Sequence, residues 1–298
     1  MRSVLARNLS VICALLGAVC FPATADATEL EPYEFVTVPA GTTVFLGYAI
    51  YGQHDEFKPI GGPKQDNNTN LDTNLGIARL AHYFDIGNTL ALVEVLQPFG
   101  RLDKVRIGGA PLTGSSGLGD STFAAAVWPI NKKENQTYLG VTLYVTVPTG
   151  AYDKFQTINL GGNRAVYDPE IALHQGFGEH WSVDLTADMF LYGNNDQAGA
   201  LGQQTLTQKN SAQVQGFVNY KWSNGLATSI GYEGYRGGRQ ELDGVDNGLR
   251  THFDEVRFVA SKFITSKFQL LGEVNHQFNV DGGFRQDVGF TLRALYVF

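Results

Sequence analysis

The chain has 298 residues, of which 43% are hydrophobic, 12% aromatic and only 17% charged, with 35 glycines and ten prolines. This apolar and aromatic content excludes a disordered protein, whose composition is polar and highly charged. The chain carries 22 lysines and arginines against 29 acidic residues, so its net charge of −7 argues against a nucleic-acid partner.

Residues 1–25 have the pattern of a secretory signal peptide. Arg2 and Arg7 precede an apolar run over residues 11–21, and small residues follow at 23–25. The apolar run is too short to cross a bilayer as a helix, which disfavours a membrane anchor. We therefore expect an exported protein, and loss of the two arginines makes the mature chain more negative.

Cleavage of this leader fits equally well after Ala25 or after Ala27. Both cysteines, Cys13 and Cys20, lie within the leader, so the mature chain is expected to form no disulfide. A lipoprotein is disfavoured because Val19 is bulky at the position before Cys20, where a lipidated cysteine requires a small residue.

Residues 26–41 form a short segment with Pro32 and Pro39 ahead of the first predicted strand. Two placements are compatible with its sequence: a plug inside a barrel, or a periplasmic extension. We divide the chain accordingly into a signal peptide (1–25), this segment (26–41) and a transmembrane β-barrel (42–298).

Residues 42–298 show hydrophobic alternation of period two between turn residues, without a convincing helical stripe. Most of the segments reach ten residues or more, which is enough to cross a bilayer at a tilt. The twelve predicted strands are 42–53, 71–84, 89–98, 119–129, 137–148, 166–177, 181–192, 209–222, 226–235, 251–264, 268–278 and 286–298.

The connections between these strands alternate in length. The connections after the even-numbered strands are tight: 85–88, 130–136, 178–180, 223–225 and 265–267. Those after the odd-numbered strands are 54–70, 99–118, 149–165, 193–208, 236–250 and 279–285, and all but the last are long. Short periplasmic turns opposite long extracellular loops are typical of outer-membrane barrels, and a soluble β-sandwich has no reason to keep this parity.

The last predicted strand shows two chemically different faces. One face is apolar and the other polar: Val288, Phe290, Leu292, Ala294, Tyr296 and Phe298 against Asp287, Gly289, Thr291 and Arg293. This pattern fits a lipid-facing exterior and a wet interior, and closure into an all-β antiparallel barrel would pair every strand edge. Strands two and three are less clear, since apolar residues flank Arg79 and Glu94 on both faces. A secreted sandwich is the alternative fold.

The end of the chain resembles the C-terminal signature that the outer-membrane barrel-assembly machinery recognises, with an aromatic last residue, Phe298, after alternating apolar positions. Three further stretches, 114–120 (GSSGLGD), 147–153 (VPTGAYD) and 159–163 (NLGGN), are similar to those of the outer-membrane transporters associated with the meta-pathway of phenol degradation. This resemblance implies a barrel that moves aromatic or other small hydrophobic compounds by passive diffusion. We also expect contact with outer-membrane lipid and lipopolysaccharide.

No segment resembles a phosphate-binding loop or a zinc site, so we expect no cofactor, no metal and no enzymatic activity. The enzyme class that we keep as an alternative is an outer-membrane lipid hydrolase, because His180 and Ser182 share one strand face at a predicted periplasmic turn. A structural or adhesive barrel that acts through its loops is the third class.

If the protein is a channel, its working residues are the polar residues that face inward. Ionisable side chains are tolerated toward a lumen, whereas they are costly against lipid. By strand parity the candidates that line the lumen are Asp120, Glu170, His174, Asp184, Asp188, Asn219, Glu233, Glu255, Arg257, Glu273 and Arg293.

Overall fold

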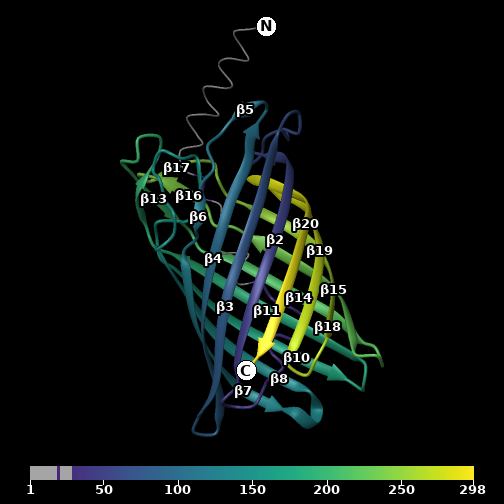
Figure 1. Ribbon diagram of the computed structural model, residues 1–298. Helices are drawn as coiled ribbons and strands as arrows, with labels where there is room; N and C mark the ends of the chain where they lie inside the picture. Colours follow the sequence, from purple (N-terminus) through teal and green to yellow (C-terminus); the bar gives the residue numbers. More distant parts are fainter. Residues whose placement is uncertain (1–18, 21–28) are drawn as a thin grey trace.

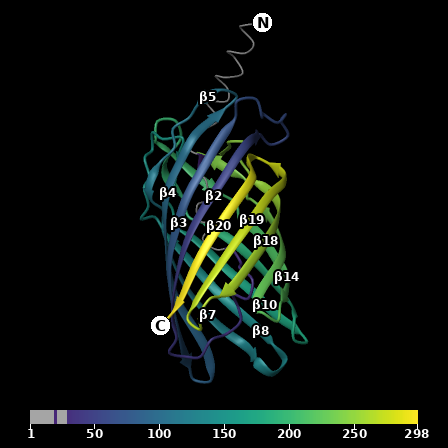
Figure 2. The same cartoon turned by 45° about the vertical axis from the view of Figure 1, so that its right-hand side comes forward.

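Twelve long strands form one closed antiparallel barrel (Figures 1 and 2). The computed structural model describes residues 19–20 and 29–298, so the predicted signal peptide and its cleavage positions lie almost wholly outside the described residues. The barrel strands are β2 (Thr43–Lys58), β3 (Asn70–Ile86), β4 (Thr89–Ile107), β7 (Ser121–Lys132), β8 (Thr137–Val147), β10 (Val166–Phe177), β11 (Trp181–Tyr192), β14 (Ser211–Lys221), β15 (Leu226–Arg236), β18 (His252–Phe263), β19 (Phe268–Asp281) and β20 (Gly283–Val297).

Each barrel strand pairs with its sequence neighbours, and β20 closes the barrel by pairing with β2. Val44 lies opposite Val297, and the backbone N–H of Phe298 donates to the carbonyl oxygen of Thr43. The predicted all-β barrel of twelve strands is therefore confirmed. In the described part of the chain, no helix is long and apolar enough to cross a membrane.

The first ten connections alternate in length as predicted. The turns near the C-terminal end of the barrel are short, and one of them holds the 3-10 turn η1 (Lys133–Asn135). The long loops at the opposite end carry the remaining short strands: β5 (Ala110–Pro111), β6 (Ser116–Leu118), β9 (Ile158–Asn159), β12 (Asn195–Ala198), β13 (Gln204–Gln208), β16 (Gln240–Leu242) and β17 (Val245–Asp246). Strands β12, β13, β16 and β17 form a separate sheet there, and β9 pairs in parallel with β1 (Val19–Cys20).

Strand β4 continues nine residues past Pro98, where the sequence predicted its end. Pro98 pairs with Ile77 on β3, and its carbonyl oxygen accepts the N–H of Gly119 on the other side. In an antiparallel strand the N–H and C=O of one residue point the same way, so the missing donor of Pro98 faces away from β3. The pairing of β4 with β3 is therefore unaffected, and the predicted end of the strand was wrong.

The last connection is also shorter than predicted. Strands β19 and β20 extend to Asp281 and from Gly283, so that Gly282 alone joins them in place of residues 279–285. The extension is held by β2, whose Lys58 pairs with Gly283 and whose Phe57 ring packs edge-on against Phe284 at 5.1 Å. The turn therefore lies beyond the position where the hydrophobic alternation fades.

Inner and outer faces differ as the alternation predicted. Phe290, Leu292 and Tyr296 on β20 are 48%, 58% and 42% exposed, whereas Arg293 is 5% exposed and points inward. Arg79 and Glu94, whose faces the sequence left unclear, also point inward. Their inward neighbours Ala81, Leu90 and Leu92 are apolar because they contact other apolar side chains inside the barrel.

The two larger apolar clusters of the described residues fill parts of the interior. The lower cluster lies toward the short turns and consists of Leu30, Phe35, Ala81, Leu90, Leu92, Ala126, Trp128, Tyr138, Ala172, Phe217, Val259 and Leu271. The upper cluster lies toward the long loops and consists of Phe57, Leu71, Leu102, Val105, Ile107, Ile158, Leu160 and Phe284. Polar and charged side chains of the strands lie buried between and around them.

Candidate functional site in the barrel lumen

Residues 29–38, which we call the lumen segment, lie inside the barrel. The backbone N–H of Leu30 donates to the side chain of Gln215, and that of Tyr33 donates to the carboxylate of Asp184, both at 3.0 Å. Phe35 packs against Trp128, whose indole N–H donates to the Phe35 carbonyl oxygen at 3.0 Å. Of the two placements compatible with the sequence of residues 26–41, the structure shows the one inside the barrel for this part.

Three glutamates anchor the lumen segment to three arginines of the wall. Glu29 lies 3.3 Å from Arg257, Glu31 contacts Arg293, and Glu34 lies 2.7 Å from Arg79. None of the three glutamates, nor Arg79, was among the residues predicted to line the lumen. An acidic segment ahead of a barrel with inward arginines is the signal that would have pointed to this pairing.

Each of these arginines also has a partner on the barrel wall. Arg79 donates two hydrogen bonds to Glu94, of 2.7 and 3.0 Å, and Arg293 donates to Gln269. A bidentate arginine–carboxylate pair fixes both side chains in one orientation. The wall partners therefore hold the arginine side chains in the orientation in which they contact the lumen segment. Because the three arginines are buried, removing the partners of one of them would leave an uncompensated charge.

The eleven candidate residues are all buried, with exposed fractions of 6% or less. The structure brings them into separate groups. Glu233, Glu255, Arg257 and Glu273 meet on β15, β18 and β19, and Arg257 donates to Glu273 at 2.8 and 3.0 Å. Arg293 lies apart from this group and pairs with the lumen segment.

A second group links three neighbouring strands. His174 on β10 and Asp184 on β11 form a hydrogen bond of 2.6 Å, and the amide of Asn219 on β14 donates to Asp184 at 2.6 Å. The ring of Tyr33 lies 5.7 Å from that of His174, so an aromatic residue of the lumen segment covers this polar network. Glu170 and Asp188 face each other across β10 and β11 as a third group.

Asp120 lies just before β7 and joins two loops. Its carboxylate accepts the backbone N–H of Gly150 at 2.8 Å and that of Gly162 at 2.7 Å. Burial raises the pKa of Asp120 above its ordinary value, and these two N–H groups oppose that rise. A Cβ at Gly150 would lie 2.5 Å from the backbone of Gly119, so only glycine allows this approach.

The three stretches that carry the family resemblance therefore converge at the end of the barrel with the long loops. Ser115 accepts the backbone N–H of Leu160 through its hydroxyl oxygen at 2.6 Å, and its own N–H donates to the carbonyl oxygen of Ile158. Ile158 and Leu160 are buried in the upper cluster. The loop of residues 148–165 is thus drawn into the mouth of the barrel and narrows it.

The geometry gives no support to the catalytic alternative. His180 donates from Nδ1 to the carbonyl oxygen of Lys221 at 2.8 Å and is exposed at the turn, whereas Ser182 is buried and accepts from Asn219 at 3.1 Å. No hydrogen bond joins the two among the contacts of residues 29–298. Each side chain has a structural partner instead.

The sequence of residues 54–293 matches the family described as "Putative MetA-pathway of phenol degradation". The chain belongs to this family. It is also similar to the crystal structure of an outer membrane channel from Pseudomonas putida F1, at 30% identity and a TM-score of 0.85, over 91% of this chain and 100% of that one.

A more distant likeness shows the fold alone. The translocator domain of the autotransporter NalP from Neisseria meningitidis is 12% identical with a TM-score of 0.50, over 93% of this chain and 96% of that one. The comparison with curated proteins gave no match. The member of the phenol-degradation family described here is thus an outer-membrane β-barrel of the channel type.

Proposed function

We propose that this family member is an outer-membrane channel through which small aromatic or other hydrophobic compounds diffuse passively. The observation that carries the proposal is the likeness to the Pseudomonas putida channel over the whole of that chain, within a family described by phenol degradation. The aromatic rings inside the barrel support it. Tyr83 and Phe35 lie 5.7 and 6.1 Å from Trp128, so this part of the interior has the aromatic character with which a phenol ring is compatible.

The test is uptake of radiolabelled phenol at micromolar concentration by a Gram-negative host with few channels of its own. Cells that express the protein should accumulate phenol faster than cells with the empty vector, and a strain that lacks the native gene should be slower than its parent. Equal rates in both comparisons would overturn the proposal. The extracellular sheet of β12, β13, β16 and β17 would then favour an adhesive role.

A catalytic role is not part of the proposal. The similar structure from Pseudomonas putida is a channel, and the side chains of His180 and Ser182 form hydrogen bonds with different partners. Purified protein should release no fatty acid from phospholipid micelles above the background without protein. Lipid hydrolysis that Ser182→Ala abolishes would instead support an enzyme.

The placement in the cell follows from the same fold. We propose export by the signal peptide of residues 1–25, assembly through the C-terminal Phe298, and contact of the apolar outer face with lipid and lipopolysaccharide. Phe298 is 67% exposed at the barrel end, where another protein can reach it. Deletion of Phe298 should lower the amount of protein in outer-membrane fractions, and unchanged amounts would contradict recognition of this residue.

A further inference from the structure

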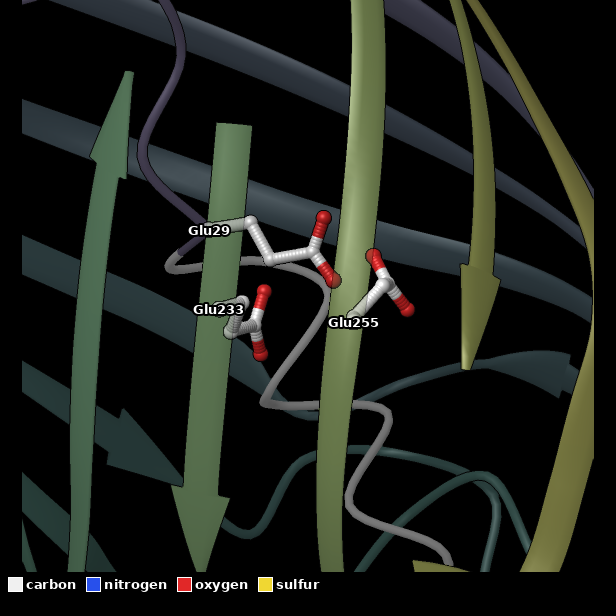
Figure 3. Close-up of side chains that lie close together, drawn as sticks. All are labelled: Glu29, Glu233 and Glu255. Carbon is white, nitrogen blue, oxygen red and sulfur yellow. The ribbon is translucent and has the colours of Figure 1, made fainter. Parts of the chain in front are cut away.

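Three carboxylates converge inside the barrel (Figure 3). Glu29 comes from the lumen segment, whereas Glu233 on β15 and Glu255 on β18 lie directly opposite each other in the sheet. One oxygen atom of each residue lies within 4.8 Å of the corresponding atoms of the other two. The wall residues are almost fully buried, with exposed fractions of 1% and 2%.

The nearby arginine does not neutralise this group. Arg257 forms its bidentate pair with Glu273, to which it donates at 2.8 and 3.0 Å. Its nitrogen atoms lie 3.3 Å from Glu29, 3.7 Å from Glu233 and 4.0 Å from Glu255. The last two distances are longer than a hydrogen bond. The single positive charge of Arg257 therefore lies among four carboxylates but forms its strong hydrogen bonds mainly with one of them.

Two oxygen atoms of this group have no hydrogen-bond donor. They are Oε2 of Glu233 and Oε1 of Glu255. Gln213 donates its amide N–H to Oε1 of Glu233 at 2.6 Å and leaves its own buried carbonyl oxygen without a donor. Buried oxygen atoms without a partner cost free energy, and a buried carboxylate costs more than a neutral group. A further positive charge, as a proton or as a metal cation, would satisfy these oxygen atoms.

We propose that Glu29, Glu233 and Glu255 bind one divalent cation of the calcium type. Carboxylate and amide oxygens are the hard ligands that Ca²⁺ takes, at about 2.3–2.6 Å. Two ligands on opposite sides of such an ion lie about 5 Å apart, so oxygen atoms within 4.8 Å of one another can share it. The ion joins the lumen segment to two strands of the wall and holds this segment inside the barrel.

The experiment is calorimetric titration of the folded, detergent-solubilised protein with CaCl2 after the protein has been stripped with a chelator. We expect one Ca²⁺ per chain and a higher unfolding temperature in its presence. Glu255→Gln should weaken binding at least tenfold. Glu170→Gln is the matched control, because Glu170 on β10 is also buried with an unpartnered oxygen but lies outside the cluster, and its Ca²⁺ affinity should equal that of the wild type.

Glu29→Gln provides a second variant outside the barrel strands, in case the strand substitution impairs folding. It should also weaken Ca²⁺ binding, and the heat-dependent gel mobility of each variant shows whether the barrel has formed. Absence of Ca²⁺ binding in the wild type would overturn the proposal, as would unchanged affinity in the folded Glu29→Gln variant. Equal losses in Glu170→Gln and Glu255→Gln would also overturn it. The titration involves no solute flux, so its outcome is independent of the proposed channel activity.

Discussion

Arg79 and Glu94 show how a charged residue is kept inside this barrel. Both are buried and joined by two hydrogen bonds, and Glu34 of the lumen segment completes the set. The sequence predicted the inward direction of the clearer candidates, such as Asp184 and Arg293, from strand parity. It did not predict the partners, because the lumen contacts join residues as far apart as Glu31 and Arg293.

Arg79→Met should lower the free energy of unfolding by about 3–5 kcal/mol, because it leaves the buried carboxylate of Glu94 and the partly buried carboxylate of Glu34 without their cation. Urea unfolding of the protein in detergent micelles measures the change. Arg239→Met is the control, since Arg239 is half exposed in a surface pair with Glu241 and should cost about 1 kcal/mol or less. Equal losses in the two variants would show that the buried pair has no special importance.

Asp120→Asn should loosen the loop of residues 148–165. An asparagine side chain offers one acceptor oxygen where Asp120 accepts two backbone N–H groups, and each such hydrogen bond to a charged group contributes about 1.5–3 kcal/mol. Limited proteolysis should cleave this loop faster in the variant than in the wild type. Asp246→Asn, in an exposed loop, accepts one N–H and should leave the cleavage rate of residues 148–165 unchanged. Identical rates for Asp120→Asn and the wild type would contradict the role of Asp120.

Strands were predictable where alternation and a tight turn coincide. The bounds of β10 and β11 agree with the sequence analysis to the residue, because both strands alternate up to the short turn between them. The end of β4 was missed because the effect of Pro98 depends on which neighbour its backbone faces. The position of the lumen segment depends on side chains of at least seven strands, so its local sequence left both placements open.

The contact between Phe35 and β8 provides a way to displace the lumen segment without changing a charge. A Cβ at Gly140 would lie 2.4 Å from the Phe35 ring, so Gly140→Leu should force this ring out of the lower cluster. We expect a larger single-channel conductance in planar bilayers. Gly272→Leu is the matched control, because a Cβ there meets no atom within 4 Å and the conductance should stay at the wild-type value. A conductance that Gly140→Leu leaves unchanged would mean that Phe35 does not obstruct the path.

The whole barrel has an apolar exterior and a charged interior, and segments of the chain occupy both ends of the lumen. The lumen segment and the lower cluster occupy the half toward the short turns, and the loop of residues 148–165 narrows the other end. The alternating loop lengths predicted this architecture, because short turns opposite long loops are typical of outer-membrane barrels. The loop lengths did not predict how far the lumen is obstructed, because the obstruction comes from segments outside the strands.

Single-channel conductance of a variant that lacks residues 29–38 tests most directly whether the barrel interior is the path. The account predicts small conductance steps for the full chain and several-fold larger steps for the deletion variant, because the segment and its three ion pairs leave the lumen together. A folded deletion variant that conducts no better than the full chain would contradict the account.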